Sequence, residues 1–249
     1  KLRYRILPFG LKSSSFVFQN IISDIIGNRL LTSCAQIYID DLIVHSATWS
    51  QHLEDLKNVF ERLRAGGLLL HPEKSLFGLN KVRFLGHFIS SEGVQVDNDK
   101  VEAIKKQPQP KNVSELHSFI GMASFYHRFV KGFSQFVVPL RKLLCREAKY
   151  VWTNDCESAF QTLKKALTEA PILALPDLRP GKPMILRTDA SYAGIGWCLG
   201  QISEVDGKER VIQYGGRGLS SSEMRWSVTD IEGLALFTAA KELHVYLSN

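Results

Sequence analysis

The chain has 249 residues, of which 45% are hydrophobic and 22% are charged, a composition typical of a globular protein with two or three small domains. No apolar run approaches the roughly 20 residues that cross a bilayer, and the amino end lacks the features of a signal peptide, so we expect no membrane partner. Four scattered cysteines lack the close pairing of a zinc site. We expect them to be reduced, in an intracellular protein of a cytoplasmic particle or the nucleus.

The charge balance is basic. A formal net charge of +6 suits a polyanionic partner, because Lys and Arg that neutralise phosphates release counterions. Many basic proteins bind no nucleic acid, so the charge alone does not decide. Three pairs of cations either follow a phosphate backbone or form solvated helix faces, and the sequence leaves both interpretations open: Lys105-Lys106, Arg141-Lys142 and Lys164-Lys165.

The first 70 residues predict helices on both sides of a hairpin. Serine hydroxyls at 13–15 precede an apolar run, which predicts a helix over 16–26 that ends at Gly27. Residues 36–44 are β-branched and aromatic on both sides of two acids, the pattern of a hairpin with acids at its turn. Helical spacing over 50–64 predicts a helix that packs on this hairpin through Leu53, Leu56, Phe60 and Leu63.

The middle of the chain predicts a strand pair and then helices. Strand-like residues over 82–89 lead to a turn at 91–93, and 97–149 should be mostly helical, with Ser114 as a cap. A helix over 154–169 begins in a capping box of Asn154 and Glu157. Pro171 and Pro176 then mark a linker. We expect core packing, not base stacking, of the aromatic residues Phe119, Phe125, Tyr126 and Phe129.

The last 70 residues predict two strands, over 184–189 and 194–199, and a helix over 231–247. Asp189 would end the first strand beside the small residues of the second. Its carboxylate fits either a metal ligand or a turn residue. Glu232 fits a metal ligand or, more commonly, the acid of a capping box that begins at Thr229.

Asp40 and Asp41 are adjacent at the predicted hairpin turn. Two carboxylates there could hold divalent cations, because Mg²⁺ prefers carboxylate oxygens together with substrate phosphates. Such a site fits phosphoryl transfer. Asp is also a common turn former, and for an arbitrary pair of aspartates that interpretation is the more frequent one.

Several motifs, in order along the chain, resemble those of reverse transcriptases from gypsy-class LTR retrotransposons. Leu7 to Lys12 with Gln19 resembles the nucleotide-pocket motif, and Tyr38-Ile39-Asp40-Asp41 resembles the YxDD box. Further matches lie in the primer grip, the thumb and the first two acidic motifs of an RNase H domain: Phe84-Leu85-Gly86-His87, Phe119-Ile120-Gly121, Tyr126-His127-Arg128-Phe129, Thr188-Asp189-Ala190-Ser191 and Glu232-Gly233-Leu234-Ala235-Leu236. The resemblance covers essentially the whole chain.

The resemblance implies a role for each matched residue. Asp40 and Asp41 would bind the polymerase metals, Mg²⁺ or Mn²⁺, and Asp189 and Glu232 those of the RNase H site. The substrate-binding residues would be Phe9 under the nucleotide sugar, Gly10, Gln19, and Tyr38 against the primer-template. The primer grip would be Phe84, Leu85, Gly86 and His87. The implied partners are a template-primer duplex, deoxynucleoside triphosphates and the rest of a Pol polyprotein.

The expected fold class is α+β, with a reverse transcriptase palm remnant and a helical thumb and connection followed by a partial RNase H-like α/β domain. We place the palm at 1–92, the thumb at 93–150, the connection at 151–180 and the RNase H-like part at 181–249. The family's polymerase site needs a third Asp upstream of Leu7, and its RNase H site needs acids beyond Asn249. We therefore expect this chain to be inactive in isolation. The alternatives are a non-enzymatic nucleic-acid-binding module, relic or domesticated, and a structural relic.

Overall fold

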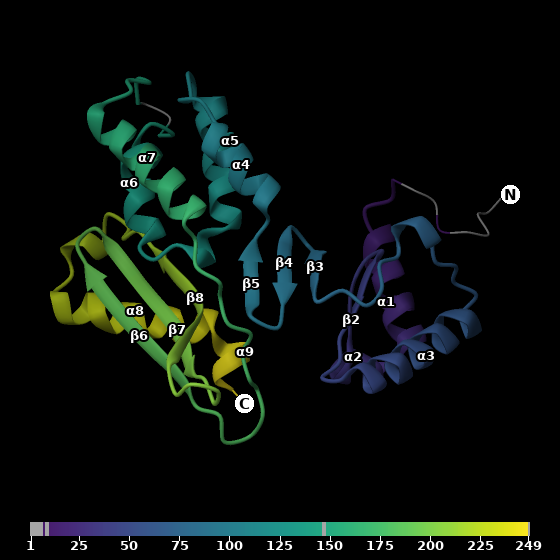
Figure 1. The fold of residues 1–249 in the computed structure, drawn as a ribbon. Coiled ribbons are helices and arrows are strands. Elements are labelled where there is room, and N and C mark those ends of the chain that lie inside the picture. The colour runs from purple at the N-terminus through teal and green to yellow at the C-terminus, as the bar shows by residue number, and fades with distance from the viewer. Residues whose placement is uncertain (1–6, 8–9, 146–147, 249) are drawn as a thin grey trace, which may run out of the picture. The chain divides into compact units, whose positions relative to one another are not determined.

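The computed structural model describes residues 7, 10–145 and 148–248, which form two compact units, Lys1–Leu79 and Asn80–Asn249 (Figure 1). The hairpin over 81–90 belongs to the second compact unit, whereas the prediction from the sequence assigned it to a palm domain over 1–92. The division into four functional parts stays a prediction. Within the described ranges, every helix is too short or too polar to cross a bilayer.

The first unit packs helices against an antiparallel hairpin. The hairpin pairs β1 with β2 from Ala35↔Val44 to Tyr38↔Asp41, which confirms the predicted turn between them. Its core joins Ile22 and Ile26 to Val59 and Leu63. The elements are α1 Ser14–Ile26, α2 Asn28–Ser33, β1 Ala35–Tyr38, β2 Asp41–Val44, α3 Trp49–Ala65 and the 3-10 turn η1 Pro72–Lys74.

Helix α3 packs on the hairpin as predicted, through part of the predicted face. Of the four residues expected to pack, Leu63 is buried and Leu56 half-buried, but Leu53 and Phe60 are 52% and 37% exposed. Asp55 and Val59, which were not expected in the core, are buried. Asp55 can occupy this face because it accepts hydrogen bonds from Ser46 Oγ (2.6 Å) and Gln51 Nε2 (3.0 Å). These bonds, that from Ser46 first, lower the pKa of the Asp55 carboxyl. Asp55, a polar residue with hydrogen-bond partners, therefore takes a buried position of α3 that the hydrophobic spacing did not identify.

The second unit begins with a three-stranded antiparallel sheet followed by helices. The sheet has the order β3-β4-β5, and the helices after it fulfil the prediction of a mostly helical segment. The elements are β3 Lys81–Phe84, β4 His87–Ser90, β5 Gly93–Val96, α4 Asn98–Lys106, α5 Val113–Phe125, the 3-10 turn η2 His127–Phe129, α6 Phe133–Lys142 and α7 Asn154–Thr168.

The rest of the second unit is a meander of three strands with a helix across one face, α8 lying on β6 and β7 (Figure 1). The third strand was not predicted. Its glycines obscure the strand pattern, yet Gly215 is required, since a Cβ there would lie 2.2 Å from Trp197 Nε1. The elements are β6 Met184–Ser191, β7 Gly194–Ile202, β8 Glu209–Arg217, the 3-10 turn η3 Glu223–Arg225, α8 Val228–Glu242 and α9 His244–Leu247.

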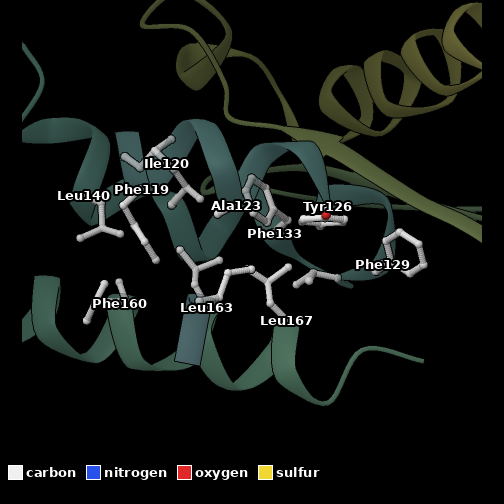
Figure 2. Close-up of a cluster of buried hydrophobic side chains, with 14 of the residues drawn as sticks. Phe119, Ile120, Ala123, Tyr126, Phe129, Phe133, Leu140, Phe160, Leu163 and Leu167 are labelled. Atoms are coloured by element: carbon white, nitrogen blue, oxygen red, sulfur yellow. The ribbon is translucent and has the colours of Figure 1, made fainter. Parts of the chain in front are cut away.

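Figure 2 shows the main core of the second unit, where α5, α6 and α7 meet. The rings of Phe119 and Phe160 lie 4.7 Å apart. Phe119, Tyr126 and Phe129 are buried, which confirms the expectation of core packing for these three. Phe125 is instead 54% exposed, so for this residue the expectation was wrong.

The predicted linker after α7 is held in place on two sides. Leu173 is fully buried and exchanges two backbone hydrogen bonds with Val94 of β5 (2.8 and 2.9 Å). The next residue, Ala174, donates a hydrogen bond to Val211 of β8 (2.7 Å). Since buried backbone pairing restricts motion, this segment joins the helical part to the β6–β8 sheet as one body.

Two helix caps differ from the predicted ones. Asn112, not Ser114, caps α5 and accepts a hydrogen bond from Glu115 N (2.9 Å). Thr153, not Asn154, caps α7. Asn112 and Thr153 both have the extended backbone that a cap requires. Where several capping residues lie close together in the sequence, the sequence does not show which of them has this backbone.

Replacing Asn112 with Ala should lower the free energy of unfolding of the second unit by about 1 kcal/mol, because it removes the cap of α5. Ser114→Ala is the matched control and should change this free energy by less than about 0.5 kcal/mol. Urea unfolding in a Trp49→Phe background, where tryptophan fluorescence reports the second unit alone, measures both. Equal losses for the two variants would contradict this placement of the cap.

Candidate catalytic sites

The two adjacent acids lie at the tip of the β1–β2 hairpin. Tyr38 and Asp41 form the last cross-strand pair, so Ile39 and Asp40 make up the two-residue turn. Both Asp40 and Asp41 are exposed at the surface. The predicted position of the acids is therefore confirmed, and their carboxylates are open to a ligand.

The turn that carries Asp40 has an unusual backbone. Ile39 has a φ of +55°, and among the described non-glycine residues only Ile39 and Leu85 have a positive φ. A β-branched residue in this region costs about 1–3 kcal/mol and persists only when its surroundings hold it there. The residue directly before the acids is thus strained.

Gln19 of α1 holds the backbone of this turn. Its Oε1 accepts a hydrogen bond from Ile39 N (2.5 Å), and its Nε2 donates to Ile37 O (3.3 Å). Nε2 also lies 3.4 Å from Ser23 Oγ on the same helix. The resemblance assigned Gln19 to substrate binding, and the sequence offered no sign of this contact with the turn.

The remaining residues predicted for the polymerase site stay predictions. Phe9 lies outside the described residues. Gly10 is exposed with a φ of +87°, and Tyr38 is 53% exposed. The cavity of about 980 Å³ in this unit lies at the open end of the hairpin, bordered by Cys34 and His45, and takes no part in the acidic tip.

A second tight turn occurs in the predicted primer grip. Phe84 pairs with His87, and the two residues between them, Leu85 and Gly86, have φ values of +49° and +74°. Positive values at both positions define a type I′ turn, which suits the twist of a hairpin. Tyr126 Oη donates a hydrogen bond to Gly86 O (3.1 Å), so this turn is docked on the end of α5.

Asp189 lies in β6, opposite Gly196 of β7. Because side chains alternate along a strand and Ala190 packs in the core with α8, the Asp189 carboxylate belongs to the other face of the sheet. Its neighbours across that face are Gly196 and then Gly216, so nothing bulky covers it from the paired strands. Asp189 is accordingly exposed.

Glu232 lies on the exposed side of α8, next to the buried Ile231. The capping box expected from Thr229 is wrong, because Ser227 caps the helix and accepts a hydrogen bond from Asp230 N (3.2 Å). Glu232 therefore has no capping role, which removes the commoner alternative. The described residues show no direct contact between Asp189 and Glu232.

The donor chemistry of both sites suits hard cations, since carboxylate oxygens are the preferred ligands of Mg²⁺. Among the described residues, however, no group of three or more Asp, Glu, His or Cys side chains is arranged to hold a metal ion. Each site thus offers carboxylates of the right kind, in groups of fewer than three among the described residues.

Two family descriptions match the chain: "Reverse transcriptase (RNA-dependent DNA polymerase)" over residues 1–89 and "RNase H-like domain found in reverse transcriptase" over residues 152–249. The "Retrovirus-related Pol polyprotein from transposon opus" of Drosophila melanogaster is 35% identical over 99% of the chain and 25% of its own length. The chain belongs to the reverse transcriptases of retrotransposon Pol polyproteins. The "Transposon Tf2-3 polyprotein" of Schizosaccharomyces pombe is 30% identical over 99% of the chain.

The reverse transcriptase chain spans only 25% and 18% of the lengths of these two relatives. Solved structures show the same fold. A foamy viral protease-reverse transcriptase in complex with double-stranded DNA matches with a TM-score of 0.84 at 23% identity, over 96% of this chain and 41% of the other. Another foamy viral structure, in complex with an RNA/DNA hybrid, matches with a TM-score of 0.80 at 24% identity, over 95% of this chain and 31% of the other. The expected α+β reverse transcriptase fold with an RNase H-like part is thereby confirmed.

Within this reverse transcriptase fold, His87 is enclosed by aromatic rings. Its imidazole stacks on Phe125 and Phe129 at centroid distances of 5.3 and 5.6 Å, and Tyr126 lies edge-on at 5.6 Å. Nδ1 lies 2.8 Å from Leu85 O, to which it must donate because a carbonyl only accepts. The other nitrogen, Nε2, is then an acceptor, and it is buried without a partner.

Burial is the main cause that lowers the pKa of His87 below its ordinary value, and the nearby Arg128 cation lowers it further. The Leu85 carbonyl and Asp97 oppose this shift. Arg128 is itself desolvated, which lowers its pKa, and its Nε is buried without a partner. A second cation beside Arg128 would be costly, so His87 is neutral at pH 7.

The basic clusters of this reverse transcriptase chain are partly used within the fold. Lys164 Nζ donates to Gln107 O (2.7 Å) and lies over the ring of Phe160. Lys105 and Lys106 lie 3.8 and 3.7 Å from the carboxylate of Glu102. These side chains have local structural partners, and contacts of the clusters with phosphates stay a prediction.

The stability of the second unit should depend on pH through His87. Its folded-state pKa is lowered, so the unfolded chain binds more protons and stability should be lost as the pH falls below about 6.5. His87→Phe keeps a ring and removes the titration, so this variant should lose less stability than the wild type between about pH 7 and pH 5. Urea unfolding at several pH values measures the difference. His117→Phe, at an exposed position of α5, should follow the wild-type profile; a His87→Phe profile parallel to wild type would contradict the expectation.

Proposed function

We propose that this chain forms the palm, thumb, connection and RNase H-like parts of a gypsy-class Pol polyprotein, which extends a primer on an RNA or DNA template and cleaves the RNA of RNA–DNA hybrids. The observation that carries this proposal is the pair of exposed carboxylates, Asp40 and Asp41, at the tip of a hairpin in a chain of the reverse transcriptase family. The parts would divide as 1–92, 93–150, 151–180 and 181–249.

Two acidic sites would serve one kind of chemistry. Asp40 and Asp41 would hold divalent cations, Mg²⁺ or Mn²⁺, at the polymerase site, and Asp189 and Glu232 would do so at the RNase H site. When bound, such cations activate the attacking oxygen and neutralise the leaving one, whether the nucleophile is a primer hydroxyl or a water. The exposure of all four side chains supports access of a phosphate substrate.

The proposed partners are a template-primer duplex, deoxynucleoside triphosphates and the rest of the polyprotein. Phe9, Gly10 and Tyr38 would contact the nucleotide or the duplex, and the primer grip would be Phe84, Leu85, Gly86 and His87. The net charge of +6 supports a polyanionic partner. Foamy viral proteins of the same fold have been solved with double-stranded DNA and with an RNA/DNA hybrid. All four cysteines are free, in keeping with an intracellular setting, in a cytoplasmic particle or the nucleus.

A second candidate is a nucleic-acid-binding module without catalysis. It is favoured by the basic charge together with the lack, among the described residues, of any group of three metal-binding side chains. Both functions predict salt-sensitive binding to duplexes. Only the catalytic one predicts an activity that requires the acidic residues.

Two substitutions should separate the activities in a Pol polyprotein that contains this chain. Asp41→Asn should lower primer extension by about 100-fold or more and leave RNA cleavage intact, because it removes a cation ligand from one site only. Asp189→Asn should have the opposite effect. Primer-extension and hybrid-cleavage assays on the same preparations, at fixed Mg²⁺ concentration, measure both.

The matched controls are exposed acids of the same elements or units. Asp24→Asn on α1 and Glu242→Gln on α8 should leave both activities within about twofold of wild type. If Asp41→Asn retains wild-type extension, the proposed polymerase site is wrong. If neither activity is present before substitution, the binding module becomes the better description.

The 249-residue polypeptide by itself should bind duplexes without extending primers, because its described residues bring no third acidic side chain to Asp40 and Asp41. A duplex-binding titration at two salt concentrations, run beside a primer-extension assay with Mg²⁺, tests this. Extension that depends on Mg²⁺ would show that the two described acids suffice.

A further inference from the structure

The turn between β1 and β2 needs an external support. Ile39 adopts a left-handed backbone that glycine adopts freely and a β-branched residue does not. In a two-residue hairpin loop, the backbone N–H of the first loop residue has no partner in the strand ladder. Without a support, this segment would relax to a more favourable conformation, and Asp40 and Asp41 would move with it.

Gln19 supplies that support from a fixed position. Gln19, Ser23 and Ile26 lie on one face of α1, at spacings of four and three residues, together with the buried Ile22. Ile22 and Ile26 belong to the core that contains Ala35 of β1 and Val59 of α3. Helix α1 is therefore anchored on the hairpin through this face, and the Gln19 side chain reaches the tip of the hairpin from it.

The amide of Gln19 contacts the backbone on both sides of Tyr38. Its carbonyl oxygen accepts from Ile39 N at 2.5 Å, and its NH₂ group donates to Ile37 O at 3.3 Å. An amide with one acceptor and one donor end matches these two backbone groups, whereas a carboxylate or an apolar side chain does not. Since both ends of the amide have partners in the protein, Gln19 is less available for a nucleotide.

We propose that Gln19 is a positioning residue that holds the strained turn at Ile39 and thereby fixes the directions of the Asp40 and Asp41 carboxylates. Gln19 acts through the backbone and does not touch the substrate. The expected effect of Gln19 on catalysis rests on the polymerase function proposed above. The expected effect of Gln19 on the turn does not. A displacement of about 1 Å at a catalytic group can cost about 100-fold in rate, so a support of this kind matters for activity.

The first experiment measures the turn in the 249-residue chain. Gln19→Met keeps the length of the side chain and removes both hydrogen bonds. We expect the amide of Ile39 to exchange with solvent at least about tenfold faster in this variant, by NMR hydrogen exchange, while the amides of α1 and α3 keep their protection. Gln36→Met is the matched control, because Gln36 donates to Leu31 O (3.1 Å) near the opposite end of β1. An unchanged exchange rate at Ile39 would overturn the proposal.

The second experiment measures catalysis in a Pol polyprotein that contains the chain. Gln19→Met should lower kcat for primer extension by about tenfold or more, with the KM for the nucleotide within about twofold of wild type. Gln19→Met combined with Ile39→Gly should recover part of kcat, because glycine adopts the positive φ without support. A merely structural role of Gln19 would not produce this recovery.

The outcomes separate the two proposals. If the wild-type polyprotein extends primers and Gln19→Met raises KM while kcat is unchanged, Gln19 binds substrate and its positioning role is wrong. If the wild-type polyprotein has no extension activity, the proposed polymerase function fails, and the exchange rate of Ile39 alone decides whether Gln19 holds the turn. Gln36→Met should leave kcat and KM unchanged.

Discussion

The contact between α1 and the β1–β2 hairpin is the constraint on which the acidic tip depends. A two-stranded hairpin by itself is marginally stable in water, and this one contains a residue with an unfavourable backbone at its turn. The hairpin is stabilised because Ala35 and Cys34 are buried against Ile22, Ile26, Val59 and other residues of the first unit's core. Packing of α1 also brings the Gln19 side chain to the tip of the hairpin. The same face of α1 therefore contacts the strands through Ile22 and Ile26 and the turn through the amide of Gln19.

The second unit applies the same principle to a different turn. The β3–β4 hairpin is docked through Gly86 and His87 on Phe125, Tyr126 and other rings at the end of α5. A Cβ at Gly86 would lie 3.3 Å from Phe125, so the close approach favours glycine in addition to the positive φ. In both units, a helix that is part of the core fixes the tip of a hairpin. The proposed polymerase acids and the proposed primer grip lie at or next to those tips.

Much of this fold could be predicted from the sequence, because hydrophobic periodicity and turn residues are local signals. They identified α1, α3, the β1–β2 hairpin and its acidic turn. Features that depend on partners distant in sequence could not be predicted in this way. The sequence alone gives Asp55 the character of a surface acid, and its burial depends on hydrogen bonds from Ser46 and Gln51. In strand β8, Gly215 is explained by the indole of Trp197, which lies where a Cβ would be. The contact of Gln19 with Ile39, across 20 positions, belongs to the same class.

The two hairpin turns differ in a way that relates strain to position. At 85–86 the second loop residue is glycine, which carries its positive φ without cost, and the strain falls on Leu85 alone. At 39–40 no glycine is present, and the strained residue directly precedes Asp40. A glycine at 39 would relieve the strain, but it would also widen the set of conformations open to the acids. Ile39, which is β-branched and restrained by Gln19, has fewer backbone conformations open to it. The strain at Ile39 therefore accompanies a turn that presents the carboxylates of Asp40 and Asp41 in one direction.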